Sequence, residues 1–300
     1  MRGWLWCVLV LHSGGDVARG AGFVAPLTSW SDFAASRLWD DGRAEVALYD
    51  VSGSRYGLER AFEAITVVVK EPFDLERHVK AAAGQDGRST EVLKLNHEVT
   101  LPTGVYSYRQ MATLQLRRSD LEPLKLTTTS QELCGITTKH WRSDHPDRLR
   151  THSYFDGEGD RDHELPADEA WVFYDALPLK LRSMTPSAEP LELRLLPPQL
   201  SNRAPAPELA PAVLRWGGIE ELATPVGAIS VRQVTLEHAG GQDVFSLQED
   251  FPHILVRWQQ ADGTTYLLRN MRRIAYWRRT KPGDRELLER PDPVRSLAIP

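Results

Sequence analysis

Apolar and polar residues alternate along most of the chain between Arg43 and Trp277. A period of two residues is that of a β-strand with one buried face, because successive side chains point to opposite faces of a sheet. Short segments rich in Gly, Pro, Asn and Asp separate the alternating runs. The pattern predicts strands over residues 43–51, 59–71, 92–101, 105–117, 124–133, 136–142, 149–155, 226–238, 244–249, 254–260, 264–270 and 274–278.

The connections between these runs are short, so strands that follow one another in the sequence are expected to pair antiparallel as a meander. Ser52-Gly53-Ser54, Gly240-Gly241 and Asp262-Gly263 are the expected turns. The run from Ala64 to Val69 is apolar at both odd and even positions. Such a run is typical of a strand that is covered on both faces, so we expect it at the centre of the sheet.

Helical spacing is confined to short stretches. Trp30, Phe33 and Leu38 form one apolar stripe, which predicts a helix over residues 29–40. Two further short helices are expected over residues 75–83 and 168–177, the second because Pro166 and an acidic pair precede or begin it.

The predicted fold class is all-β and mainly antiparallel, with a large curved meander sheet, half-barrel or barrel-like, and a few short helices. Residues 23–280 are expected to form a single β-rich domain. It is either one unit or two sheet halves, 43–182 and 190–280, joined by a Pro-rich segment. The polar, Pro-containing residues 281–300 are expected to be an extended tail.

The N-terminus has the order of a secretory signal peptide. Arg2 precedes an apolar run over residues 3–11, and the small residues Gly20, Ala21 and Gly22 follow. We therefore expect residues 1–22 to be removed and the protein to be periplasmic or associated with the cell envelope. A lipid anchor on Cys7 and a start site placed too early are the alternatives. No other stretch approaches ~18 consecutive apolar residues, so no transmembrane span is expected.

Composition narrows the functional classes. Lys and Arg number 36 against 41 Asp and Glu, a net charge of −5, so no basic excess is present to hold a nucleic acid. The sequence contains no phosphate-binding loop, and no cofactor is expected. Cys7 and Cys134 are its two cysteines, which excludes a disulfide framework. Nine Trp residues indicate aromatic side chains in the core or along a concave surface.

Cys134 and His140 are the candidate catalytic pair. They flank a turn at Gly135, and opposed strands could bring the thiol and the imidazole together for nucleophilic catalysis. The alternative is that Cys134 is a small buried residue in a tight hairpin. No cysteine-hydrolase signature surrounds Cys134, so this second interpretation is favoured.

A set of polar and aromatic residues on two neighbouring predicted strands forms the candidate ligand-binding face: Tyr106, Tyr108, Arg109, Gln131 and Glu132. Such a face could line a concavity that binds a polar ligand. The alternative is the solvent-exposed face of the sheet, which shows the same alternation.

Other clusters favour structural explanations. Acidic residues alternate over residues 156–162 and histidines are frequent over residues 140–163, but neither spacing matches a calcium or zinc site, and no metal is expected. Basic and aromatic residues gather over residues 266–281. They suit contact with anionic lipid or polysaccharide, and suit better the protection of a sheet edge against aggregation.

Four phrases of the sequence resemble a group of uncharacterised bacterial envelope proteins, some of which carry the label septum formation inhibitor. These phrases lie at residues 92–96, 103–111, 130–135 and 153–160. Ile136-Thr137 stands where the family usually has an aromatic residue. The label implies a nucleotide-hydrolase fold, which this sequence does not predict because it shows no βαβ alternation.

The C-terminal half, with Phe251-Pro252-His253 and Arg257-Trp258, is similar to β-rich periplasmic proteins that are close in architecture to outer-membrane lipoprotein carriers. These resemblances imply a compartment and an architecture, and no activity.

The functional hypothesis is a non-catalytic envelope protein whose curved sheet binds a lipidic ligand, a glycan or a protein partner. One alternative is a hydrolase or transferase that uses Cys134 and His140. The other is a structural envelope component without a ligand pocket. A pocket lined by Trp and Tyr would favour binding, and contact between the thiol and the imidazole would favour catalysis.

Overall fold

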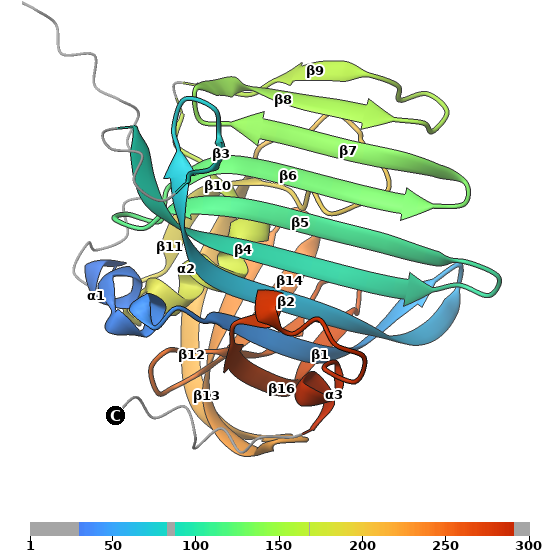
Figure 1. The fold of residues 1–300 in the computed structure, drawn as a ribbon. Coiled ribbons are helices and arrows are strands. Elements are labelled where there is room, and N and C mark those ends of the chain that lie inside the picture. Colours follow the sequence, from blue (N-terminus) through green and yellow to red (C-terminus); the bar gives the residue numbers. More distant parts are fainter. Residues whose placement is uncertain (1–29, 83–87, 168, 291–300) are drawn as a thin grey trace, which may run out of the picture.

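The computed structural model describes residues 30–82, 88–167 and 169–290 (Figure 1). The expected signal peptide over residues 1–22, with Cys7, lies outside the described residues. The strands are β1 (Ala44–Arg55), β2 (Leu58–Asp74), β3 (Val79–Lys80), β4 (Ser89–Pro102), β5 (Ser107–Arg117), β6 (Pro123–Glu132), β7 (Gly135–Arg142), β8 (His145–Ser153), β9 (Arg161–Glu164), β10 (Val172–Phe173), β11 (Leu191–Leu196), β12 (Ala210–Thr224), β13 (Gly227–His238), β14 (Gly241–Gln248), β15 (Leu255–Gln259) and β16 (Thr265–Ile274).

The described helices are short. They are α1 (Trp30–Ala35), η1 (Arg37–Asp40), η2 (Tyr174–Ala176), α2 (Leu177–Lys180), η3 (Leu181–Ser183), η4 (Tyr276–Arg278) and α3 (Glu286–Glu289). In the described part of the chain no helix has the length and apolar character needed to cross a membrane.

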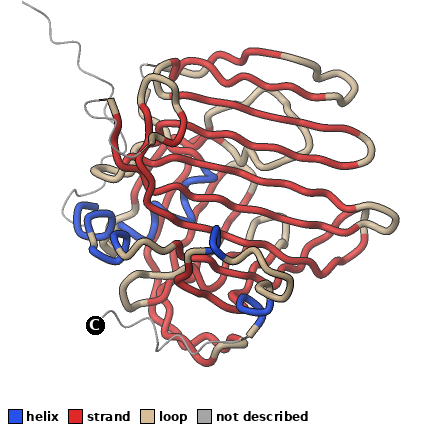
Figure 2. The backbone as a smooth tube through the Cα atoms, viewed as in Figure 1, coloured by secondary structure: helices blue, strands red, loops and turns tan. Residues whose placement is uncertain are grey.

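All described strands belong to one strongly curved sheet (Figure 2). Its order is β10-β11-β12-β13-β14-β15-β16-β1-β2-β4-β5-β6-β7-β8-β9, with β3 attached to β2. The last long strand, β16, therefore pairs with the first, β1, and β9 and β10 are the two edges. The described strands pair antiparallel except β10 with β11. The all-β, mainly antiparallel and half-barrel-like prediction is confirmed.

The inner face of the curved sheet holds the main hydrophobic core, to which Ala64 and Val68 of β2 contribute. Val69 points to the other face, where it packs in a second cluster that Tyr276 and Leu288 help to cover. The run from Ala64 to Val69 is thus covered on both sides as the apolar pattern predicted, although Ile65 and Val67 stay half-buried.

The prediction of a helix that starts at residue 75 is wrong. Asp74 ends β2, and its carboxylate accepts the backbone N–H groups of Glu76 at 2.9 Å and Arg77 at 2.8 Å. His78 then has a φ of 53°, outside the right-handed helical region. A side chain that satisfies nearby N–H groups offers the backbone an alternative to a helix, and a turn followed by β3 results.

Three other local predictions need correction. Residues 168–177 do not form one helix, because Val172 and Phe173 are extended as β10 and α2 begins at Leu177. The helix expected over residues 29–40 is divided at Ser36, whose extended backbone and side-chain cap on Leu38 end α1 and begin η1. The strand expected over residues 274–278 is replaced by η4 after β16 ends.

The first hairpin turn lies further along the chain than expected. β1 continues through residues 52–54, and the turn is made by Tyr56 and Gly57, with φ values of 57° and 71°. Two successive positive φ angles are typical of the tight turns that match the twist of a hairpin.

The Pro-rich segment contains β11 and leads into β12, a strand of 15 residues that the sequence analysis missed. Between these strands, residues 197–209 run across the inner face of the sheet. The hydroxyl group of Thr128 donates to the carbonyl oxygen of Gln199 at 3.3 Å, and that of Thr137 donates to Asn202 at 2.7 Å. Buried polar residues of β6 and β7 are thus paired with this crossing segment.

Candidate functional site

Two hollows lie at opposite ends of the curved sheet. We call the first the polar cavity: it has a volume of about 270 Å³ and lies where β1 ends and β16 begins. We call the second the apolar pocket: it has a volume of about 300 Å³ and lies between α1, η3 and the end of β14. Ligand sites have volumes of roughly 300–1,000 Å³, so the apolar pocket is at the lower end of this range and the polar cavity is slightly below it.

A row of aromatic side chains forms one wall of the polar cavity. Strand register places Phe245, Trp258 and Tyr266 side by side on β14, β15 and β16. The Trp258 ring stacks on Phe245 at 5.4 Å and on Tyr266 at 4.9 Å between ring centroids. His97 of β4 reaches this row across the interior, with its ring centroid 5.8 Å from that of Trp258. The curl of the sheet brings together strands that are not neighbours.

Two buried ring nitrogens in this wall lack hydrogen-bond partners. His97 is 9% exposed and Trp258 is 4% exposed, and both line the polar cavity. Neither His97 Nε2 nor Trp258 Nε1 has a partner among the described residues. Burial lowers the pKa of His97 to about 4, so its imidazole is neutral at pH 7. Buried polar atoms are usually paired, so these two indicate a site for bound water or a ligand.

Tyr174, at the rim of the same cavity, is held by a buried network. Its hydroxyl group donates to Asp243 and accepts from Gln260 Nε2 at 3.2 Å. His238 Nε2 lies 3.2 Å from the second oxygen of Asp243. Burial, followed by the charge of Asp243, raises the pKa of Tyr174. The hydroxyl group is therefore stabilised in its protonated form and is not prepared to act as a base.

Asp175 also lines the cavity, and the crossing segment binds its carboxylate. The backbone N–H groups of Gln199 and Leu200 donate to it at 2.8 and 3.2 Å. Burial raises the pKa of Asp175. Its oxygens have donors already, so the residue positions the crossing segment over the cavity.

The structure brings three of the five predicted ligand-face residues together. Tyr108 and Glu132 lie on the inner face beside the polar cavity, and Tyr106 contacts Tyr108 with 5.7 Å between ring centroids. Arg109 and Gln131 are exposed on the outer face. The two groups separate because residues next to each other in a strand point to opposite sides.

Asn202 of the crossing segment links this cluster to the cavity. Its side-chain amide donates to Glu132 Oε1 at 2.9 Å, and its oxygen accepts from Arg55 Nη2 at 3.3 Å. The Arg55 guanidinium group lies over the Tyr108 ring, 4.5 Å from its centroid. Arg55 Nε lacks a partner among the described residues and is a third unpaired donor next to the polar cavity.

Sequence reasoning missed the residues that define the cavity: Arg55, His97, Tyr174, Asn202 and Trp258. They come from widely separated segments, and no motif joins them. The high Trp content was a general signal for an aromatic concavity. Trp258 itself was singled out only in the resemblance to β-rich periplasmic proteins, and not as a site residue.

The proposed contact between Cys134 and His140 is wrong. Register pairs Glu132 with Gly135 and Thr127 with His140, which separates the two positions along the hairpin by roughly 17 Å at about 3.4 Å per residue. Cys134 is exposed in the turn, which also corrects the expectation of a buried thiol. His140 is thus not placed to act as a base for Cys134.

The described chain contains no cluster of three or more metal-ligating side chains. Two of the histidines of residues 140–163 have other partners: His152 Nδ1 lies 3.2 Å from Asp160, and His163 Nε2 lies 3.1 Å from the Thr151 hydroxyl group. The prediction that the C-terminal basic residues protect a sheet edge is also wrong. β16 is an interior strand of the sheet, and its Arg269 binds Asp50 and Glu63.

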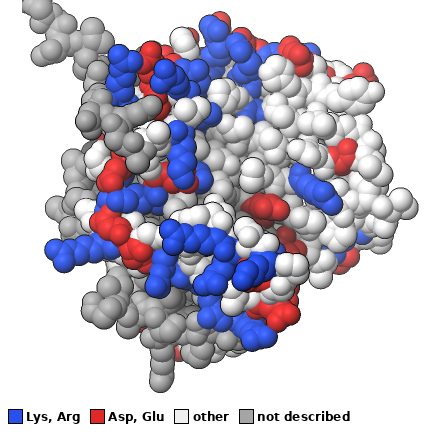
Figure 3. Space-filling model, viewed as in Figure 1, with Lys and Arg blue, Asp and Glu red and all other residues white. Residues whose placement is uncertain are grey.

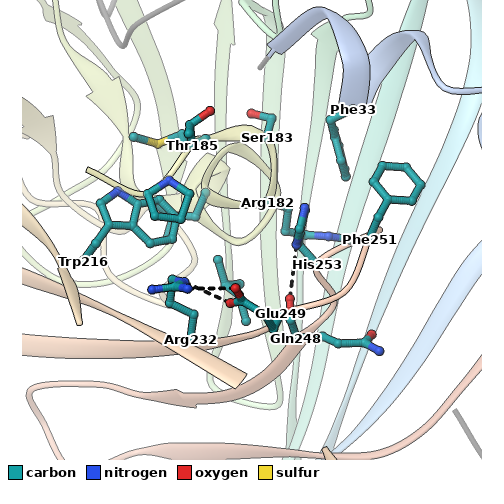
Figure 4. Close-up of a pocket in the computed structure, with 14 residues that line it drawn as sticks. Phe33, Arg182, Ser183, Thr185, Trp216, Arg232, Gln248, Glu249, Phe251 and His253 are labelled. Atoms are coloured by element: carbon teal, nitrogen blue, oxygen red, sulfur yellow. Dashed lines mark hydrogen bonds and ion pairs between the residues drawn. The ribbon is translucent and has the colours of Figure 1, made fainter. Parts of the chain in front are cut away.

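The apolar pocket has a different character (Figure 4). Phe33, Met184, Trp216 and Phe251 are among the residues that line it. Two arginine side chains of this pocket form ion pairs with glutamates. Arg232 binds both oxygens of Glu249 at 2.7 and 2.9 Å, and Arg182 binds both oxygens of Glu45 at 2.7 and 2.8 Å.

No family model matches the chain. No curated protein matches it either. A solved structure from Brucella abortus, described as a beta-barrel-like protein of domain of unknown function DUF1849, is similar at a TM-score of 0.44 and 11% identity. The similarity covers 78% of this chain and 98% of that chain.

Proposed function

We propose that this chain is an exported, non-catalytic envelope protein that binds a small, uncharged, hydroxyl-rich ligand of the glycan class in the polar cavity. The observation that carries the proposal is the pair of buried, unpartnered ring nitrogens, His97 Nε2 and Trp258 Nε1, in an aromatic wall. Hydroxyl groups both donate and accept hydrogen bonds, so they can satisfy an indole N–H and either tautomer of a neutral imidazole.

The shape and charge of the cavity support this ligand class. Trp258 and Tyr266 bring apolar aromatic surface to a lining that also contains polar side chains, which suits the mixed C–H and hydroxyl surface of a sugar. Charged groups of both signs line the cavity, Arg55 against Asp175 and Asp262. Backbone N–H groups already bind both carboxylates, which favours a neutral ligand over an ion. The lining also carries amide and hydroxyl side chains, among them Gln110, Asn202 and Thr264, that can form hydrogen bonds with sugar hydroxyl groups.

Binding without catalysis is supported by the state of the reactive groups. The Tyr174 hydroxyl group donates a hydrogen bond to Asp243, and Cys134 lies in an exposed hairpin turn away from His140. Cys134 has no contact with His140 that could remove its proton, and burial together with the charge of Asp243 raises the pKa of Tyr174, which opposes ionisation of its hydroxyl group.

The test is native mass spectrometry of protein purified from its host, followed by calorimetric titration with mono- and oligosaccharides. We expect a retained or titratable sugar. Trp258→Phe removes one donor and should weaken binding about fivefold, because a neutral hydrogen bond contributes about 1 kcal/mol. Trp277→Phe, at an exposed indole, is the matched control and should bind as wild type. No retained mass and no heat with any sugar would refute the proposal.

A lipidic ligand in the apolar pocket is the second candidate. It is favoured by the apolar lining that Phe33, Met184, Trp216 and Phe251 provide. Retained acyl chains in the native mass spectrum, lost in Phe251→Ser and kept in Trp258→Phe, would support this ligand instead.

Export is a separate part of the proposal. Intact-mass measurement of protein from an envelope fraction should show a chain that begins near residue 23. Full-length protein that retains Met1 in a cytosolic fraction would contradict it.

A further inference from the structure

The ends of three hairpins expose apolar side chains that a water-soluble surface does not require. These side chains belong to the β1–β2, β4–β5 and β6–β7 turns. We call them the tip surface: Tyr56 is 63% exposed, Leu58 60%, Val105 96%, Leu133 80% and Ile136 54%. One exposed apolar residue is ordinary, whereas five at neighbouring turns indicate an interaction site.

The three turns lie next to one another at one end of the sheet (Figure 1). β2 pairs with β4 and β5 pairs with β6, so the hairpins are consecutive in the sheet. Figure 3 shows that Lys, Arg, Asp and Glu gather over the left, lower and upper parts of this view. The right-hand part, toward the hairpin ends, is mostly uncoloured.

Hydrogen bonds join two of these turns, β1–β2 and β4–β5. The Tyr56 hydroxyl group bonds to those of Tyr106, at 3.1 Å, and Tyr108. Arg60 donates to the carbonyl oxygen of Thr103 in the next turn at 2.6 Å. Because the turns are held together before any contact forms, docking would require little further ordering.

Basic side chains surround the tip surface without acidic partners. Arg55 binds Asn202, Arg60 binds backbone carbonyl groups, and Arg109 is exposed; in the described residues none of the three forms an ion pair with a carboxylate. Elsewhere arginines such as Arg269 do form such pairs. Glu59 is an exposed acidic residue on the first turn. Unpaired guanidinium groups are suited to phosphate, which they bind in bidentate geometry.

We propose that the tip surface docks on a lipid bilayer that contains anionic phospholipid. Leu58, Val105 and Leu133 would enter the boundary between headgroups and acyl chains, and the nearby arginines would contact the phosphates. The apolar side chains project from separate turns, and Tyr hydroxyl groups lie among them. Side chains of this kind suit the bilayer interface, where tyrosine is enriched. The proposal does not rest on a ligand in the polar cavity, although Arg55 lies at both sites.

Co-sedimentation of the protein with large phosphatidylcholine vesicles, with and without phosphatidylglycerol, tests the proposal. We expect binding to the vesicles that contain phosphatidylglycerol and weaker binding to phosphatidylcholine alone. The combined variant Leu58→Ser, Val105→Ser, Leu133→Ser should bind at least about tenfold more weakly, because three apolar side chains lose their contact with the acyl boundary. Arg109→Gln should reduce the preference for phosphatidylglycerol.

The matched control is Leu75→Ser, Val79→Ser, Ile219→Ser, which changes three apolar side chains exposed by 43%, 48% and 54% away from the three turns. It should bind vesicles as wild type does. Circular dichroism and thermal unfolding verify that both combined variants are folded. Failure of the folded wild type to sediment with either vesicle, or unchanged binding by the tip variant, would overturn the proposal. Self-association of the wild type, lost in the tip variant by light scattering, would identify a second copy as the occupant and would also overturn it.

Discussion

The two ends of the curved sheet differ in how their buried charged groups and ring nitrogens are paired, although Gln248 Oε1 at the apolar pocket also lacks a partner among the described residues. Beside the apolar pocket, the buried Arg182 has a bidentate partner in Glu45 and also donates to the Pro252 carbonyl oxygen at 3.1 Å. Beside the polar cavity, His97 Nε2 and Trp258 Nε1 are equally buried and have no partner among the described residues.

This difference separates stability from binding. A fully paired buried charge holds elements together, and at this end Arg182 connects η3 to β1 and to the loop before β15. Unpaired buried groups reduce stability, so their presence is best explained where a ligand or ordered water completes them. We therefore assign a structural role to the pair of Arg182 and Glu45, and the binding role to the polar-cavity end with its two unpaired ring nitrogens.

The largest expected effect is at the paired end. Glu45→Ala leaves the Arg182 guanidinium group buried without its carboxylate, which should reduce the free energy of unfolding by about 3–5 kcal/mol. Urea denaturation at pH 7 measures it. Glu237→Ala removes the partner of Arg215 in an exposed pair and is the control, with an expected change below about 1 kcal/mol.

If Glu45→Ala reduces the free energy of unfolding no more than the control does, the pair of Arg182 and Glu45 does not stabilise this end of the sheet. The double variant Glu45→Leu, Arg182→Met removes both charges and should be more stable than Glu45→Ala.

The next effect concerns His97 at the unpaired end. Its pKa in the folded protein is about 4, against an ordinary value of 6.5. Between these values the unfolded chain binds a proton that the folded chain excludes, so the free energy of unfolding falls as the pH falls from 6.5 toward 4. The expected contribution of His97 is a loss of about 2 kcal/mol between pH 7 and pH 5.

Urea denaturation at pH 7 and pH 5 measures this loss in the wild type and in His97→Phe. The variant should lose about 2 kcal/mol less than the wild type over this interval. His145→Gln, at a histidine that is 67% exposed in its side chain, is the control and should keep the wild-type pH dependence. Equal pH dependence in His97→Phe and wild type would show that His97 is not buried as described.

Strand positions were largely predictable from the sequence, because alternation reports directly which face is buried. Where prediction was wrong, side chains or distant segments decided the local structure. Asp74 caps a turn in place of a helix, and Val172 pairs with Leu195, 23 positions further along the chain. The Ala- and Pro-containing start of β12 lacks the strong β-forming residues that made other strands recognisable.

The candidate site was less predictable. Tyr108 and Glu132 were identified because aromatic and polar residues alternate on neighbouring strands. His97 and Trp258 meet only because the sheet curls, and Asn202 reaches the cavity in a Pro-rich segment without a regular pattern. A sequence pattern states which residues share a face, but the curvature that joins distant strands depends on the whole sheet.

A smaller effect is expected where the crossing segment closes the polar cavity. Asn202→Ala removes the amide that joins Arg55 to Glu132 and should reduce the free energy of unfolding by about 1–2 kcal/mol, because both partners lose a hydrogen bond. Ser201→Ala, next to it in the segment, is the control. An equal small loss in both variants, measured by urea denaturation, would show that Asn202 does not hold this end together.

The smallest effect is expected at Cys134, which lies in the hairpin turn beyond the polar cavity. Its exposure and its separation from His140 imply that Cys134→Ser changes stability by less than about 0.5 kcal/mol and leaves sugar and vesicle binding unchanged.

A thiol reagent at neutral pH should modify the native protein about as fast as it modifies glutathione. Exposure alone gives this rate, whereas an activated nucleophile reacts faster because a nearby base or cation stabilises the thiolate. His140→Ala separates the two cases, because it should leave the rate unchanged. Labelling much faster than glutathione that slows in His140→Ala would restore the catalytic hypothesis, and labelling that requires denaturant would show that the turn is buried.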